Sequence, residues 1–178
     1  MQLEVLSYET QPAVFRPYIP LAPQVAALLI GAIQRQDARL AGDHIGSTAV
    51  PECRGKGIVD LAITYPDGEL DAAKSALAAL GFQPQTGRDP FPESRPMRVA
   101  TVRALGSTFQ VHAHVLLRGG DEHRTLLGFR NALRRDPALR AAYEADKERI
   151  VASGVTDSLE YCYAKEAFIA AALSVIAK

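Results

Sequence analysis

Two different spacings of apolar residues run along this chain, one typical of helices and one typical of strands. Helical spacing extends from about Val25 to Ile33, after a proline-rich approach that discourages an earlier start. A second helix is predicted within 67–82, where acidic residues open the pattern and Gly81 takes the place of a left-handed cap. The same spacing predicts further helices within 121–137, 136–154 and 156–178.

The middle of the chain predicts strands. An extended segment at 40–48 is closed by Gly46, and a buried strand at 57–66 is stopped by Pro66. The segment 87–97 contains three prolines and charges on both sides of an aromatic residue, which predicts a loop. Such a loop is long enough to cover a site, and it is equally consistent with a plain surface excursion.

A β-hairpin is predicted between residues 98 and 117, because apolar and polar residues alternate on both sides of Gly106 and Ser107. A period of two sends successive side chains to opposite faces of a sheet. The two histidines of this stretch, His112 and His114, therefore point the same way, opposite to the apolar residues between them.

Strands in the middle and helices at the end predict an α+β fold, and the absence of a break or repeat in composition predicts a single domain over residues 1–178. Basic and acidic residues number 20 each, so no overall field draws the chain to nucleic acid or to an acidic membrane. Cys53 and Cys162 form neither a disulfide framework nor a CxxC metal motif. Because the start is unlike a signal peptide and no apolar run could cross a bilayer, we expect a cytoplasmic protein. The patterns do not indicate an oligomeric state.

A glycine–serine turn and an aspartate on the following strand have the spacing that phosphoryl-transfer sites use. Gly46 lets backbone N–H groups approach a phosphate closely, and the hydroxyl of Ser47 can donate a further hydrogen bond. Asp60 offers a hard oxygen ligand to Mg²⁺. The same residues are also consistent with a tight turn followed by one buried or edge aspartate that has no ligand.

Two-metal transfer requires more acids than this pattern contains. A second carboxylate is needed two residues after the first, and a third on a neighbouring strand. Position 62 is Ala62, and no acid occurs between residues 97 and 118, where His112 and His114 stand instead. One aspartate with two histidines is a poor site for Mg²⁺ and a better one for zinc, manganese or iron, which accept imidazole. We therefore expect a divalent cation, Mg²⁺, Mn²⁺ or Zn²⁺, with Asp60, His112 and His114 as ligands and catalytic candidates. Alternatively, the imidazoles bond to neighbours, or bind phosphate when protonated.

The longer string HIGSTAVPECRGKGIVDL at 44–61 closely resembles the signature of the GrpB family. The similarity continues in FQVHAHVLL, LLGFRNALRRDPALRAAYEADK and YCYAKEAFI, so it covers nearly the whole chain. Glu52 and Cys53 replace the usual Gly-Leu of the family, and Gly57 replaces the usual proline. The resemblance implies a nucleotidyltransferase-like fold, which is a short mixed β-sheet flanked by helices, with the turn and the strand aspartate at the active centre. A helical segment is expected to follow at the C-terminal end.

The resemblance also implies a set of phosphate contacts. The turn would provide Gly46, Ser47 and Thr48, the next loop would provide Lys56, and the last predicted helix would provide Lys165. A lysine near the turn neutralises phosphate oxygens as a compact point charge. The alternative for each lysine is a solvated surface amine.

Several other polar residues lie near these positions in the sequence. His44 precedes the turn and is expected to orient it, whereas His123, near a helix start, is expected at the surface. Arg130 and Arg134 are four residues apart on one predicted helix face, where like charges repel unless acids or a phosphate lie opposite.

Three functions fit these patterns. The first is an enzyme of nucleotidyl or phosphoryl transfer acting on a nucleotide or another phosphorylated small molecule. The second is a nucleotide-binding or regulatory module without catalysis, which Ala62 favours. The third is a structural role, which would leave the paired histidines and the glycine–serine turn without a purpose. Dependence of ligand binding on a divalent ion separates the first two.

Overall fold

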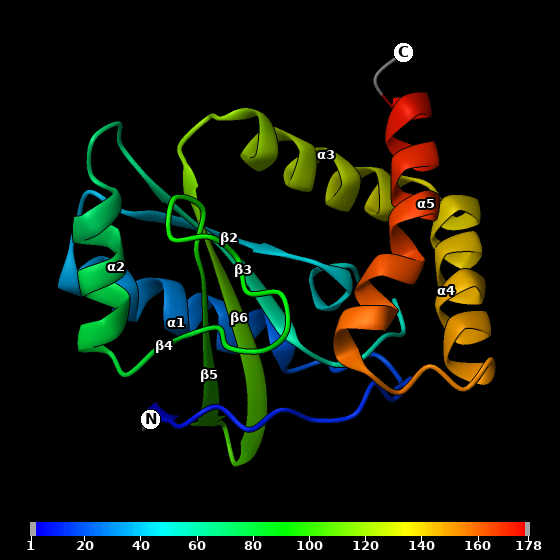
Figure 1. The fold of residues 1–178 in the computed structure, drawn as a ribbon, viewed down its shortest axis with the longest axis horizontal. Coiled ribbons are helices and arrows are strands. Elements are labelled where there is room, and N and C mark those ends of the chain that lie inside the picture. Colours follow the sequence, from blue (N-terminus) through cyan, green and yellow to red (C-terminus); the bar gives the residue numbers. More distant parts are fainter. Residues whose placement is uncertain (1–2, 177–178) are drawn as a thin grey trace.

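The computed structural model describes residues 3–176, which fold around a six-stranded mixed β-sheet (Figure 1). Its strands are β1 Glu4–Leu6, β2 Ala41–Ile45, β3 Val59–Tyr65, β4 Gln83–Pro84, β5 Met97–Ala104 and β6 Ser107–Leu117. The order across the sheet is β1-β5-β6-β3-β2, and β4 pairs with β5. Only β3 and β6 pair in parallel within these residues, and this pair lies in the interior of the sheet.

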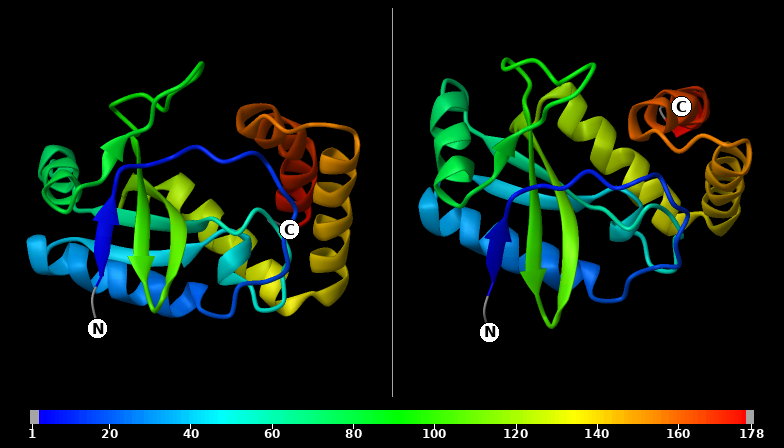
Figure 2. Two further views of the ribbon diagram at one scale, coloured as in Figure 1. Left: turned by 90° about the horizontal axis from the view of Figure 1, so that it is seen from below. Right: turned by 60° about the horizontal axis from the view of Figure 1, so that its bottom comes forward.

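Helices cover both faces of the sheet and extend past one end of it. They are α1 Ala22–Gln36, α2 Leu70–Ala79, α3 Asp121–Arg135, α4 Pro137–Ala152 and α5 Ser158–Ile176. α1 and α2 pack on one face, and α3 crosses the other (Figure 2). α4 and α5 lie side by side beyond the end of the sheet, near the turn that follows β2 (Figure 1).

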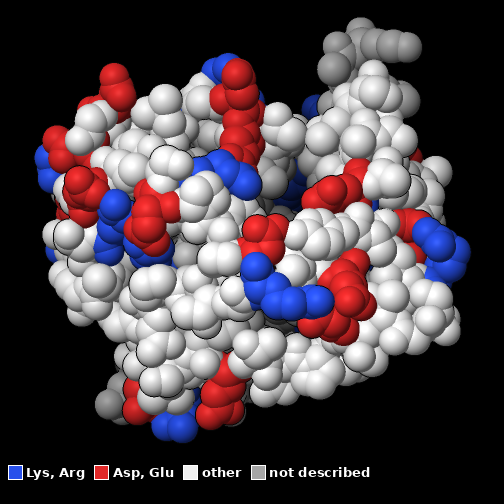
Figure 3. Space-filling view, viewed as in Figure 1, with Lys and Arg blue, Asp and Glu red and all other residues white. Residues whose placement is uncertain are grey.

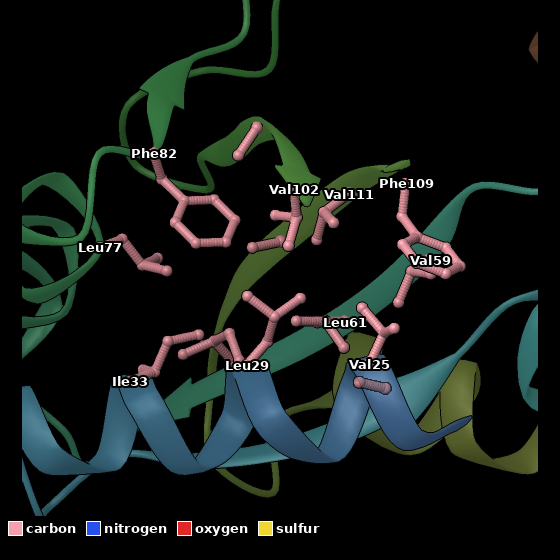
Figure 4. Close-up of a cluster of buried hydrophobic side chains, with 14 of the residues drawn as sticks. Val25, Leu29, Ile33, Val59, Leu61, Leu77, Phe82, Val102, Phe109 and Val111 are labelled. Carbon is pink, nitrogen blue, oxygen red and sulfur yellow. The ribbon is translucent and has the colours of Figure 1, made fainter. Parts of the chain in front are cut away.

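The main core lies between the sheet and α1. Val25 and Leu29 of α1 project toward Val59 and Leu61 of β3, and Ile33 lies further along α1, on the side of Leu77 (Figure 4). Each of these side chains is buried. Because side chains alternate along a strand, this packing turns the odd-numbered residues of β3 toward the core. The even-numbered residues of β3 consequently face the opposite side, under α3 and α5.

The α+β class is confirmed, and the predicted helices and strands are present with bounds that differ by a few residues. Gly81 follows α2 with a φ of 95°, as a left-handed cap requires. The hairpin turn is formed by Leu105 and Gly106, because Ser107 already pairs with Ala104. The sequence does not predict β1 and β4, because strands of three and two residues are too short to show a period of two.

The surface mixes charges of both signs. Figure 3 shows acidic and basic side chains interspersed over one face of the molecule, which agrees with their equal numbers. The same view shows the surface hollowed along one side of α5. Within residues 3–176, every helix is either too short or too polar to span a bilayer.

Candidate functional site

The candidate site lies on the sheet face opposite the main core, where β3 and β6 run side by side. Their parallel register pairs Asp60 with His112 and Ala62 with His114, so these residues share one face. His112 Nδ1 lies 3.6 Å from Asp60 Oδ1. The structure thus brings Asp60 together with His112 and places His114 two residues further along β6.

The glycine–serine turn lies directly against Asp60. Gly46 has a φ of 68° and a ψ of −173°, a conformation nearly confined to glycine. A Cβ atom added to Gly46 would lie 2.3 Å from Asp60 Oδ2, so only glycine lets the turn approach the carboxylate this closely. The hydroxyl of Ser47 lies beside Gly55, because a Cβ atom added to Gly55 would lie 2.6 Å from Ser47 Oγ. The turn therefore contacts both the strand aspartate and the loop that carries Lys56.

Thr48 and His44 hold the turn in place. Thr48 is buried, and its hydroxyl donates to the carbonyl of Ile58 at 2.9 Å. That hydroxyl has one hydrogen, so at the 3.0 Å contact with His44 the ring Nε2 must donate. Burial lowers the pKa of His44 to about 4, and the charges of Arg134 and Arg130 act in the same direction. His44 orients the turn as expected, and the hydroxyl of Thr48 takes part in fixing the turn.

Two arginines of α3 fix the backbone on both sides of the turn. Arg130 Nη1 donates to the carbonyl of His44 at 2.8 Å. Arg134 donates from Nε and Nη2 to the carbonyl of Ala49, at 2.9 and 2.7 Å. Asp43 lies 3.6 Å from Arg130, which provides part of the expected acidic partner. These like-charged side chains are accommodated because backbone carbonyls lie opposite them, and they act as positioning residues.

The expectation that His123 lies at the surface is wrong. Its Nε2 lies 3.1 Å from Asp43 Oδ2, its Nδ1 accepts from the backbone N–H of Gly119 at 3.2 Å, and its side chain is only 13% exposed. The imidazole ties the start of α3 to β2. The docking of α3 on β2 buries it, and the residues around His123 in the sequence do not reveal that docking.

Lys56 and Lys165 converge on the site from different elements. Lys56 belongs to the loop before β3 and Lys165 to α5, and their Nζ atoms lie 4.9 and 4.7 Å from the centroid of one ring, that of Tyr161. Tyr161 is buried, so its ring is a fixed platform for both cations. Burial raises the pKa of Asp60 to about 6, while the charges of Lys165 and Lys56 lower it. Both lysines are therefore within electrostatic reach of the strand carboxylate.

The loop that carries Lys56 is anchored on α4. The carboxylate of Glu144 accepts from the backbone N–H of Arg54 at 3.2 Å and from its side-chain Nε at 3.0 Å. Lys147 is 1% exposed, donates to the carbonyl of Arg54 and lies 3.6 Å from Cys53 Sγ. The sequence patterns do not single out this buried lysine, because a lysine in an amphipathic helix usually marks the exposed face.

Tyr8 is a site residue that the sequence patterns do not reveal. It follows β1 in an irregular segment, and its hydroxyl lies 2.9 Å from His112 Nε2. Burial lowers the pKa of His112 to about 3. Burial likewise lowers the pKa of His114 to about 4, and Phe91 of the loop before β5 packs edge-on against this ring, with centroids 5.6 Å apart. Both imidazoles are therefore neutral near pH 7, so neither one offers a cation to phosphate.

The available donors do not fit a two-cation site. Among residues 3–176, no group of three or more histidine, cysteine, aspartate or glutamate side chains is arranged to hold a metal ion. Ala62, in the place of a second carboxylate, is fully buried. It packs in an apolar cluster with Ile45, Leu116, Leu126 and Leu127. Asp60 and His112 offer one carboxylate and one imidazole, which are too few donors to clamp two divalent ions.

A cavity of about 290 Å³ adjoins the site. It lies between the segment that follows β1 and the start of β6, and Lys56 forms part of its wall. Arg16, Thr108 and Gln110 also line it. The cavity therefore reaches the site through Lys56, and its lining does not include Gly46, Ser47, Asp60 or His112.

Asp60→Asn is expected to stabilise the protein above pH 6. The pKa of Asp60 in the folded chain is about 6, against an ordinary value of 3.8, so stability is highest while the carboxyl is protonated and falls as pH rises through this window. Asparagine keeps the shape without the charge and should recover about 2 kcal/mol. Urea unfolding across this pH range measures the effect. Equal pH profiles for parent and variant would show that Asp60 is not buried in its charged form.

Comparison with known proteins identifies the family. The family model described as GrpB protein matches residues 15–174. A UPF0157 protein of Deinococcus radiodurans is 35% identical over 130 residues, which cover 72% of this chain and 63% of the relative. A UPF0157 protein of Vibrio cholerae is 30% identical over 146 residues, which cover 82% of this chain and 68% of the relative. The chain thus spans somewhat under two thirds of the length of the Deinococcus relative.

Solved structures share the fold. The crystal structure of GrpB from Enterococcus faecalis has a TM-score of 0.70 and 22% identity, over 92% of this chain and 96% of that one. Cid1, in a structure concerned with its RNA terminal uridylyl transferase activity, has a TM-score of 0.51 and 14% identity, over 75% of this chain and 41% of that one. At these identities the likeness shows the fold alone, which is the expected nucleotidyltransferase-like one. With the family model matching most of its length, the chain belongs to the GrpB family.

Proposed function

We propose that this protein binds a nucleotide or another phosphorylated small molecule at the turn formed by Gly46 and Ser47. The observation that carries the proposal is the close packing of this turn on Asp60. Lys56 and Lys165 share the ring of Tyr161, and their charges act on the Asp60 carboxyl. Gly46 keeps the backbone open to a close approach, and Lys56 and Lys165 supply positive charge for phosphate oxygens. The cavity beside Lys56 offers room for the remainder of the ligand.

Nucleotidyl or phosphoryl transfer is the second candidate function. The fold shared with Cid1 favours it, as does the position of Asp60 beside His112. A carboxyl group with a pKa of about 6 next to a neutral imidazole is suited to accept a proton near neutral pH. The donors at Asp60 and His112 do not match a two-metal centre, so this candidate function does not use a pair of divalent cations.

Thermal unfolding in the presence of nucleoside mono-, di- and triphosphates tests the binding function. A ligand at a hundred times its dissociation constant adds about 2.7 kcal/mol to stability, and we expect this gain from phosphorylated compounds only. The corresponding nucleosides are the matched controls, and each compound is measured with Mg²⁺ and with a chelator. If no phosphorylated compound raises the melting temperature in either condition, the proposed function is wrong. Conversion of a bound nucleotide would support the second candidate.

A further inference from the structure

Apolar side chains surround the Ala62 position next to Asp60, whereas two lysines act on the Asp60 carboxylate itself. This difference indicates which groups could neutralise a bound phosphate. In the direction of Ala62, the face is filled by apolar packing beneath α3. In a two-metal site this is where a second carboxylate would project and hold a cation. The loop before β3 and helix α5 carry Lys56 and Lys165, whose positive charges act on the same carboxylate.

Tyr161 explains how two like charges are held near each other. Both ammonium groups lie within 5 Å of its ring centroid, and the ring is buried and cannot turn away. An aromatic ring attracts a cation without adding a negative charge, so Tyr161 helps to position Lys56 and Lys165. Burial lowers the pKa of Lys56, repulsion from Lys165 acts in the same direction, and the carboxylates of Asp60 and Asp157 act against both. An anion that enters beside the turn relieves this repulsion.

We propose that Lys56 and Lys165, held on Tyr161, take the place of metal ions, so that the site binds its phosphorylated ligand as the metal-free anion. This inference rests on the proposed function and deepens it. Lysine ammonium groups supply compact positive charges that can each donate to a phosphate oxygen. In this arrangement Asp60 lies next to the bound anion but does not bind a cation.

Calorimetric titration with inorganic tripolyphosphate tests this inference, since the probe has phosphates but no base or sugar. We expect binding in the presence of a chelator that is at least as tight as binding with Mg²⁺, because Mg²⁺ neutralises the probe before it meets the lysines. Lys165→Gln should weaken binding about 10-fold to 100-fold, the effect of losing one charged hydrogen bond. Lys165→Arg keeps the charge and the stacking on Tyr161 and should retain most of the affinity.

Two further variants distinguish the lysine role from a metal site. Asp60→Asn removes a negative charge near the anion, so it should bind tripolyphosphate as well as the parent or better, whereas loss of a metal ligand would abolish binding. Lys74→Gln removes a lysine from α2, on the opposite face of the sheet, and should leave the affinity unchanged. Circular dichroism of each variant confirms that it is folded before titration.

The possible outcomes separate this inference from the proposed function. Binding that requires Mg²⁺ and is lost in Asp60→Asn would overturn the lysine role and leave the proposed function standing. Failure of tripolyphosphate to bind, when the nucleotide panel does stabilise the protein, would also overturn it. If neither tripolyphosphate nor any nucleotide binds in either condition, both fail.

Discussion

Gly46→Ala is expected to lower the free energy of unfolding by about 4 kcal/mol, as the sum of backbone strain and a steric clash. The backbone of Gly46 has a φ of 68° and a ψ of −173°, a region that residues with a side chain rarely enter. The added Cβ would also stand 2.3 Å from Asp60 Oδ2 and 3.1 Å from Asp60 Cβ. The turn must therefore move away from β3, and binding of phosphorylated ligands should fall with stability. Urea unfolding and the nucleotide panel measure the two effects.

Gly119→Ala is the matched control for this prediction. Gly119 has the same φ of 68°, but an added Cβ would meet no atom within 4 Å. We expect this variant to cost about 1 kcal/mol, which is the strain of a positive φ without a clash. The excess cost in Gly46→Ala then measures what the extended ψ of Gly46 and the contact with Asp60 add together. If the two variants lose the same stability, the close packing of the turn on the strand carboxylate is not a determinant of the fold.

The pairing of Asp60 with His112 could be predicted in outline from the sequence. The period of two between 98 and 117 places both histidines on one face, and a buried strand at 57–66 is a natural neighbour for that hairpin. The family resemblance adds the turn and the two lysines. The structure contains each of these features, and β3 and β6 have the register that aligns Asp60 with His112.

Residues that reach the site from other elements could not be predicted in this way. Tyr8 lies in an irregular segment, and such a segment has no periodic pattern from which the direction of a side chain could be predicted. Arg134 and His123 contact β2 and the turn only because α3 crosses that face of the sheet. Lys147 is buried because α4 docks against the loop at Arg54. Helical spacing identifies the helices, but it does not specify the element on which each helix packs.

Ala62→Asp is the second substitution with a large expected effect, and we expect it to lower stability by about 4 kcal/mol near neutral pH. It restores the carboxylate that a two-metal strand would carry, two residues after Asp60. In this chain, however, position 62 is fully buried beneath α3 in a cluster with Ile45, Leu116, Leu126 and Leu127. A charged group there loses its hydration, and it faces the carboxylate of its cross-strand partner Asp43, so two like charges lie opposite each other.

The pH dependence of Ala62→Asp separates charge from size. Burial should raise the pKa of the new carboxyl, so the loss of stability should be largest at high pH and should shrink as acid protonates the group. Ala62→Asn, which is similar in size and has no charge, should cost less and should show the parent's pH profile. Mg²⁺ should not rescue Ala62→Asp, because α3 covers this position. Full stability of Ala62→Asp at neutral pH, or its recovery on adding Mg²⁺, would instead indicate a two-metal pocket open to cations, and the lysine-based site inferred at Lys56 and Lys165 would then be wrong.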